Sequence, residues 1–180
     1  MEHLVKEIDS IGGPDEPLDV EKLKNQAPVL NAVLAESWRL TAPLSTHVAA
    51  TTEDLEYKGY HIPKDTFVLT DIQAHNKMNN ALYPKAAEFH FQRWLPKEHA
   101  LYDPSLANTQ KIDYNVMNSN FRSFNFGPHM CLGAHFAKQE VRIVMTRLLQ
   151  NYCLEIRNES HKPFPLKQFV SEFKLTKRGS

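Results

Sequence analysis

The chain has 180 residues, which is long enough for one domain with a buried core. It carries 21 Lys and Arg residues against 21 Asp and Glu residues, so the formal net charge is zero and no basic surface indicates a nucleic acid partner. Two cysteines argue against a disulfide scaffold, nine histidines lack zinc-ligand spacing, and no apolar stretch is long enough to span a bilayer. Charges interrupt the apolar residues of Met1–Ile8, so this segment does not read as a signal peptide.

Apolar periodicity and chain breakers predict a mostly helical α+β chain with small antiparallel sheets. The expected elements are the end of a helix at 3–9, a helical turn at 19–24, a helix at 28–41, strands near 46–52, 54–57, 60–62 and 66–70, a short helix at about 71–77, and a helix at 134–152. Residues 79–94 read as largely irregular, 95–123 as a long polar loop, and 154–175 as a tail with strands around Pro163 and Pro165.

The predicted helix at 28–41 carries Glu36 and Arg39, whose spacing of three places them on one helix face. From the residues alone, the simpler interpretation is a solvated ion pair that contributes little to stability. Glu-x-x-Arg is a common pattern, so any role other than a surface ion pair requires supporting evidence from other segments of the chain.

Cys131 lies in a loop directly before the predicted helix at 134–152. A helix N-terminus favours negative charge, and its free N–H groups can lower the pKa of a thiol. Gly127 and Gly133 frame the cysteine and have no Cβ, so the backbone can pass close to a bulky group. Phe124 offers that group an apolar wall. These features suit a metal-bound thiolate, and the alternative is an inert, buried cysteine beside a helix cap.

The helix at 134–152 is expected to bury an apolar stripe against the rest of the chain. Its members are Ala137, Val141, Val144, Leu148 and Tyr152, while Lys138, Arg142 and Gln150 are expected to face water. Cys153 is expected to be a core residue at the helix end or in a strand. A disulfide between Cys153 and Cys131 would remove the thiolate and is not expected.

The pattern Phe124-x-x-Gly127-x-His129-x-Cys131-x-Gly133 resembles the haem loop of the cytochrome P450 family of haem-thiolate monooxygenases. Further segments match in the family's order along the chain, from about residue 4 to the end. They are Glu36-x-x-Arg39, the run Phe89–Trp94, and the strands between Pro43 and Pro63.

The resemblance implies that the Cys131 thiolate is the iron ligand of haem b, iron protoporphyrin IX. Phe124, Gly127 and Gly133 would adjoin the haem, and His129 would bind one of its propionates.

A second propionate ligand, usually Arg, should come from the strand after the Glu-x-x-Arg helix. Ala49 stands at that position, so the sequence departs from the family's pattern there. His47 lies two residues earlier and therefore on the same face of the strand, where we expect it to substitute.

The resemblance also implies a buried network in which Glu36 and Arg39 meet a later Arg. Arg93 is the candidate, with Phe91 where the family has Pro and Trp94 at the final aromatic place. The planar fork of Arg can serve more than one acceptor, and a buried charged network needs every member paired. We expect these three charged residues to form a structural cluster rather than a catalytic one.

The activity implied by the resemblance is insertion of one atom of O2 into a small organic or lipid-like substrate, with electrons from a reductase or ferredoxin. The long helix over the distal haem face, with its acid–alcohol pair, would precede residue 1, as would any N-terminal membrane anchor. We therefore expect residues 1–180 to be a single partial domain, the C-terminal haem-binding portion.

Two functions stay open from the sequence. One is an enzyme portion completed by the missing part, as a monooxygenase or as an isomerase or lyase of the same family that rearranges a peroxide. The other is a truncated, non-catalytic fragment that binds haem with no turnover.

Overall fold

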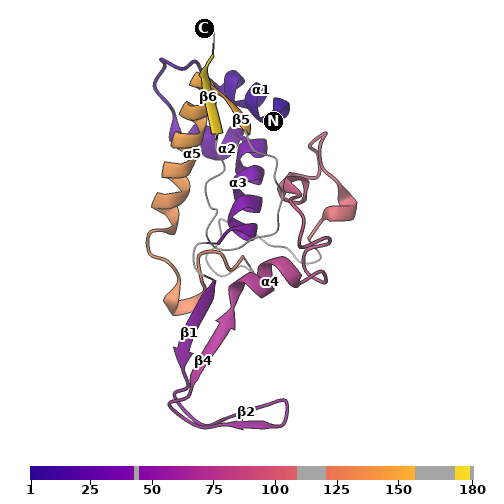
Figure 1. The fold of residues 1–180 in the computed structure, drawn as a ribbon, viewed down its shortest axis with the longest axis vertical. Coiled ribbons are helices and arrows are strands. Elements are labelled where there is room, and N and C mark those ends of the chain that lie inside the picture. Colours follow the sequence, from indigo (N-terminus) through magenta and orange to yellow (C-terminus); the bar gives the residue numbers. More distant parts are fainter. Residues whose placement is uncertain (43–44, 109–120, 157–172, 179–180) are drawn as a thin grey trace. The chain divides into compact units, whose positions relative to one another are not determined.

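The computed structural model describes residues 1–42, 45–108, 121–156 and 173–178. In this part of the chain, five α-helices and three two-stranded antiparallel sheets confirm the expected α+β class (Figure 1). The bounds are α1 Glu2–Ile11, α2 Val20–Gln26, α3 Pro28–Leu40, β1 Thr46–Ala50, β2 Leu55–Tyr57, β3 Tyr60–Ile62, β4 Phe67–Asp71, α4 Ile72–Met78, α5 Ala134–Asn151, β5 Tyr152–Ile156 and β6 Phe173–Lys177, with short 3-10 turns η1 Phe91–Trp94, η2 Pro104–Leu106 and η3 Gly127–His129.

The chain divides into two compact units, and the first is formed by Met1–Leu30 with Phe136–Ser180. Its buried apolar residues come from α1, α2, the start of α3, α5 and the residue between α2 and α3: Leu4, Ile8, Leu23, Ala27, Val29, Leu30 and Leu149. The carboxylate of Glu7 accepts the N–H groups of Val29 at 2.9 Å and Leu30 at 2.8 Å. These are free N–H groups in the first turn of α3, so an acidic side chain of α1 caps the N-terminus of that helix.

Polar side chains of α5 bind the loop that follows α1. Nε2 of Gln150 donates to the carbonyl of Gly12 at 2.7 Å. The guanidinium of Arg147 donates to the carbonyls of Gly13, Pro14 and Glu16. This loop lies outside the helices and strands, and the side chains of α5 supply hydrogen bonds to its carbonyl groups.

The face of α5 that is buried differs from the one the sequence predicts. Lys138, Arg142 and Gln150 are buried, whereas Val144 is 56% exposed. Ala137, Val141 and Leu148 are partly exposed, and Tyr152 is exposed at the start of β5. The helix is correctly placed, but the polar stripe is buried, in part because Gln150 and its neighbour Arg147 satisfy backbone carbonyls.

Cys153 lies in β5 and is exposed, so the prediction of a core residue is wrong. The strand pairs with β6 alone among the described strands, with Cys153 opposite Thr176. A two-stranded sheet of this kind leaves side chains accessible. Both cysteines are free, as expected.

The second unit, Asn31–His135, contains the rest of α3, four strands and α4. β1 and β4 run antiparallel side by side, with His47 opposite Thr70, and the β2–β3 hairpin follows at the end of that pair (Figure 1). Lys58 and Gly59 form the hairpin turn with φ of 51° and 83°. Glycine adopts this left-handed conformation without strain, which favours the tight turn.

The sequence places the early elements to within two residues of their observed ends. Asp19 and Asp71 accept N–H groups of α2 and α4 and so fix where these helices begin. The polar loop expected at 95–123 contains η2, and residues 109–120 of it lie outside the described part. The strands expected around Pro163 and Pro165 also lie outside it.

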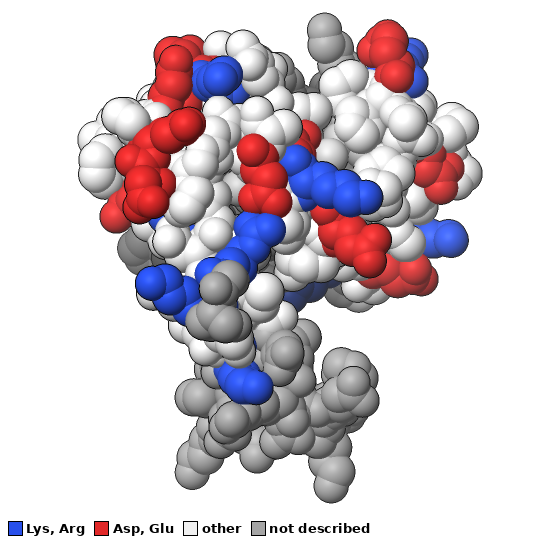
Figure 2. Space-filling view, turned by 90° about the horizontal axis from the view of Figure 1, so that it is seen from above, with Lys and Arg blue, Asp and Glu red and all other residues white. Residues whose placement is uncertain are grey.

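Charged side chains of both signs are mixed over the face drawn in Figure 2, in keeping with the formal net charge of zero. None of the described helices is both long and apolar enough to cross a membrane.

Replacing Arg147 with Lys is expected to destabilise the first unit. Lysine keeps the charge, but its compact ammonium cannot reach all three carbonyls that the guanidinium fork binds. We expect the free energy of unfolding in urea to fall by about 1–3 kcal/mol. Lys6→Arg, the reverse change at an exposed position of α1, is the control. Equal stability of Arg147→Lys and the unchanged chain would contradict the anchoring role.

Candidate functional site

The carboxylate of Glu36 is the centre of a buried ion cluster in the second unit. Arg39 binds it through both ends of its fork, with Nε to Oε2 and Nη2 to Oε1 each at 2.8 Å. Nε of Arg93 reaches Oε1 at 3.2 Å. The exposed fractions are 0% for Glu36 and Arg39 and 4% for Arg93, so this is no surface ion pair. The structure thus brings together the three residues that the sequence assigned to one structural cluster.

Two further donors complete the shell of Glu36. Nε1 of Trp94 donates to Oε2 at 2.8 Å, and the backbone N–H of His90 donates to Oε1 at 2.8 Å. Burial alone would raise the pKa of Glu36. The hydrogen bonds and positive charge of Arg39, together with the N–H groups of His90 and Trp94, outweigh burial and hold the pKa below its usual value. The carboxylate is therefore charged, enclosed and unavailable to a substrate.

The remaining N–H groups of the two arginines donate hydrogen bonds to backbone carbonyls. Arg39 donates to the carbonyls of Asn76, Ala86 and Glu88, which lie in α4 and the irregular segment after it. Arg93 donates to those of Leu106 at 3.0 Å and Pro84 at 2.9 Å. Every acceptor except those of Glu36 is main chain, so the cluster fixes the path of a segment that has little regular structure.

Tyr83 packs against this cluster. The guanidinium carbon of Arg39 lies 5.2 Å from the centre of the Tyr83 ring, and Trp94 lies 6.2 Å away on another side. Burial raises the pKa of Tyr83 to about 12, and Arg39 opposes the rise. With Leu82 and Ala86 the ring forms a small apolar core. The cluster and its core therefore read as one structural unit.

The loop before α5 holds Cys131 in a defined place. The N–H of Cys131 donates to the carbonyl of Phe124 at 2.9 Å, and the N–H of Met130 donates to that of Gly127 at 3.2 Å. The carbonyl of Cys131 accepts the N–H of Ala134, the first residue of α5, at 3.2 Å. These bonds close the loop upon itself and connect it to the helix.

The thiol of Cys131 is open to its surroundings. The residue is exposed, and so are its neighbours Leu132 and Gly133. Gly127 has φ of 58°, and a Cβ built there would meet no atom within 4 Å. An inert, buried cysteine is therefore not what the structure holds. Within the described residues, the loop is accessible at Cys131 and at Gly127.

Aromatic rings flank the loop. Phe124 makes an edge contact with Trp38 of α3, with ring centres 5.5 Å apart. His47 of β1 lies 5.1 Å from Phe126 and 5.2 Å from His129 between ring centres. His47 is 8% exposed, whereas His129 is exposed. The structure thus places His47 beside His129, while Ala49 shares its strand face without a polar group.

The sequence did not single out Asn125 and Phe126 as site residues, although both lie inside the quoted motif. Nδ2 of Asn125 lies 2.8 Å from Nδ1 of His47. No pattern links residues 78 positions apart. Only the positive φ of Asn125, 66°, marks it as unusual, and that value is a property of the structure.

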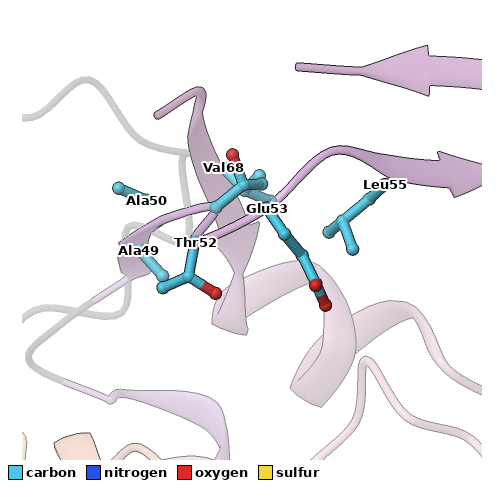
Figure 3. A pocket seen from close by; sticks show the side chains of 7 residues that line it. Ala49, Ala50, Thr52, Glu53, Leu55 and Val68 are labelled. Atoms are coloured by element: carbon cyan, nitrogen blue, oxygen red, sulfur yellow. The ribbon is translucent and has the colours of Figure 1, made fainter. Parts of the chain in front are cut away.

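The described residues contain no group of three or more His, Cys, Asp and Glu that could hold a metal ion among themselves. Cys131 therefore belongs to no such group of side chains within the part of the chain that the structure describes. A shallow pocket of about 320 Å³ lies at the end of β1 (Figure 3), lined by Ala49, Ala50, Thr51, Thr52, Glu53, Leu55 and Val68. None of these residues belongs to the cysteine loop, so the pocket is separate from the site.

Comparison with known proteins identifies the family. The family model described as cytochrome P450 matches residues 1–178. The chain belongs to the cytochrome P450 family.

Named relatives agree with this membership. A putative cytochrome P450 136 of Mycobacterium tuberculosis is 31% identical over 83% of this chain, and a probable mitochondrial cytochrome P450 12c1 of Drosophila melanogaster is 32% identical over 81%. The trichothecene C-4 hydroxylase of Trichoderma arundinaceum is 27% identical over 89%. The chain spans only 27%, 26% and 31% of these three relatives' lengths.

A solved structure shares the fold. The structure of a zebra fish cytochrome P450 with abiraterone superposes on this chain with a TM-score of 0.69 at 23% identity. The match covers 99% of this chain and 39% of the fish protein. The fold of this chain is therefore that of a portion of a cytochrome P450.

Replacing Arg93 with Ala is expected to destabilise this P450 chain strongly. The change removes one partner of the buried Glu36 carboxylate and leaves the carbonyls of Leu106 and Pro84 without donors. We expect a loss of about 3–5 kcal/mol in the free energy of unfolding, measured in urea, and a lower yield of folded protein. The control is Lys97→Ala at an exposed site nearby. Wild-type stability of Arg93→Ala would contradict the buried network.

Protonation of Glu36 is expected to lower the free energy of unfolding at acidic pH. Its folded-state pKa lies below the ordinary value of 4.5, so its contribution is complete above that value and is lost as the pH falls through the folded pKa. We expect unfolding free energies measured from neutral to acidic pH to fall in that window. Glu36→Gln should be less stable at neutral pH and show a flatter acid slope. Glu98→Gln, at an exposed position, should keep the slope of the unchanged chain.

Proposed function

We propose that this chain is the haem-binding portion of a cytochrome P450 monooxygenase, with the Cys131 thiolate as the protein ligand of the iron in haem b. The observation that carries the proposal is an exposed thiol in a loop closed by main-chain hydrogen bonds, directly before α5. A helix N-terminus favours the anionic sulfur, and glycines on both sides leave space around it.

The residues present fit a flat apolar group at the sulfur. A side chain at Gly127 would enter open space, and a Cβ at Gly133 would lie in ordinary contact with Cys131, 4.0 Å from its Sγ. Phe124 is partly exposed and stands at the start of the loop, where its ring can serve as an apolar wall. The two glycines keep side-chain bulk off the loop, and Phe124 adds apolar surface.

Two neighbouring histidines are the proposed donors to the carboxylates of the haem. The rings of His47 and His129 lie 5.2 Å apart, one buried and one exposed. An imidazole N–H can donate to a carboxylate, and a charge-assisted hydrogen bond of this kind is stronger than a neutral one. His47 would do this in place of the arginine that Ala49 does not supply.

When bound, the haem supplies the O2 chemistry through which one oxygen atom enters a small organic or lipid-like substrate. The residues of this chain hold and orient the group through Cys131, His47 and His129. Electrons would come from a partner reductase or ferredoxin. Glu36, Arg39 and Arg93 serve only the framework. In this proposal residues 1–180 act as a single partial domain, which spans 27% of the length of the mycobacterial relative.

Cys131→Ser should remove the thiolate signature of bound haem. We expect the purified chain with added haem, reduced and exposed to CO, to give a thiolate-type Soret band that the variant lacks. Cys153→Ser, at the other free cysteine, is the control and should keep the band. A band that survives in Cys131→Ser would assign the ligand to another residue and sink the proposal.

The alternative function is haem binding with no turnover. It is favoured for the isolated chain because the chain spans only 27% of a relative such as the mycobacterial protein. The two are separated by product formation with O2, an electron donor and an organic substrate. Haem binding through Cys131 without any product favours the non-catalytic function, and product formation favours the enzyme.

A further inference from the structure

The side chain of Asn125 has a fixed orientation in the cysteine loop. Its Oδ1 lies 2.9 Å from the backbone N of Phe126. A backbone N–H can only donate, so the atom it contacts is the amide oxygen. The backbone N–H of Asn125 donates in turn to the carbonyl of Arg122 at 2.9 Å. The amide group cannot be flipped without losing the bond to Phe126, which settles which of its atoms is nitrogen.

That orientation determines the proton on His47. Nδ2 of Asn125 lies 2.8 Å from Nδ1 of His47, and an amide NH2 has only donors to offer. Nδ1 must therefore accept, which requires a lone pair there and leaves the ring proton on Nε2. The hydrogen bond made by one ring nitrogen sets the state of the other. His47 is thus held as a neutral ring with a single N–H donor.

The surroundings of His47 fix the direction of that donor. The ring is buried on the inner face of β1 and packs against Phe126 and His129. Arg122 covers the ring of Phe126, with its guanidinium carbon 4.2 Å from the ring centre. Within the described residues, the hydrogen bond of the His47 ring runs through Nδ1 alone, so Nε2 remains for a ligand.

We propose that Asn125 is a positioning residue that locks His47 in its Nε2–H form, so that His47 presents a neutral donor beside His129 to an anionic oxygen. The proposal rests on the proposed function, because it takes that oxygen to be a carboxylate of haem. It explains how a histidine can serve on a strand that lacks the usual arginine. A neutral imidazole binds an anionic oxygen less strongly than a charged arginine does. Holding its N–H in a fixed orientation through a second residue offsets part of that difference.

Two substitutions of Asn125 separate its hydrogen bond from its backbone role. Asn125→Asp keeps an oxygen for the N–H of Phe126 but turns the donor to His47 into an acceptor, so Nδ1 should become protonated. Asn125→Gly removes the side chain at a position with φ of 66°, which glycine adopts without strain, and should let the ring exchange between its two neutral forms. Asn79→Asp is the matched control, since Oδ1 of Asn79 accepts the N–H of Leu82 at 3.1 Å and an aspartate there keeps that bond.

The decisive readout is the ¹⁵N spectrum of the His47 ring in the full chain at neutral pH without haem. In the unchanged chain and in Asn79→Asp, Nδ1 should show the shift of an unprotonated nitrogen and Nε2 that of a protonated one. In Asn125→Asp, Nδ1 should move to the protonated shift, with the circular dichroism of the folded chain retained. Titration with haem should then give a dissociation constant raised about tenfold in both Asn125 variants.

A protonated Nδ1 in the unchanged chain, or no change of Nδ1 in Asn125→Asp, overturns the inference whatever the haem titration gives. If Asn125→Asp fails to fold, the spectra of the unchanged chain and of Asn125→Gly decide the question. Failure of the unchanged chain to bind haem, with the ring spectra as expected, overturns the proposed function instead and removes the haem carboxylate as the ligand of His47.

Discussion

The buried carboxylate of Glu36 is the interaction on which the second unit depends. A charge without contact to water is tolerated only when every oxygen lone pair finds a donor. Glu36 meets this condition with five N–H contacts, two of them from Arg39 and one each from Arg93, Trp94 and His90. The two arginines also donate hydrogen bonds to backbone carbonyls between Asn76 and Leu106. These bonds fix the path of a long irregular segment.

That path in turn supports the loop with the cysteine. Phe121 is buried and makes an edge contact with Trp94, which itself binds Glu36. The hydroxyl of Ser123 is hydrogen-bonded to Nδ2 of the buried Asn76, and Phe124 contacts Trp38 of α3. Phe121 and Ser123, just before the motif, and Phe124, its first residue, are thus each held by residues near the ion cluster. Through these contacts the charged network helps to fix where the cysteine loop begins.

Sequence reasoning succeeds where a local pattern carries the information and fails where distance or direction decides. Spacing alone placed Glu36 and Arg39 on one face, and the short helix expected at about 71–77 is found at Ile72–Met78, because both depend on a few adjacent residues. The burial of Glu36 depends on an arginine 57 residues away, which only the family resemblance could indicate. On α5 the helical periodicity was predicted correctly, but periodicity does not say which face of the helix is buried. The polar face is buried, in part because Gln150 donates a hydrogen bond to a backbone carbonyl.

The hydrogen bonds that order the cysteine loop do not involve the side chain of residue 131. The loop is closed by main-chain bonds of Cys131, Met130 and Ala134, and its positive φ angles fall on Asn125 and Gly127, residue types that tolerate them. The thiol itself is exposed and takes no part in closing the loop. A ligand at the sulfur therefore meets a loop that is already ordered, and less binding free energy is lost in ordering the chain. For the same reason, exchanging the sulfur for oxygen changes the chemistry of the site and leaves the fold in place.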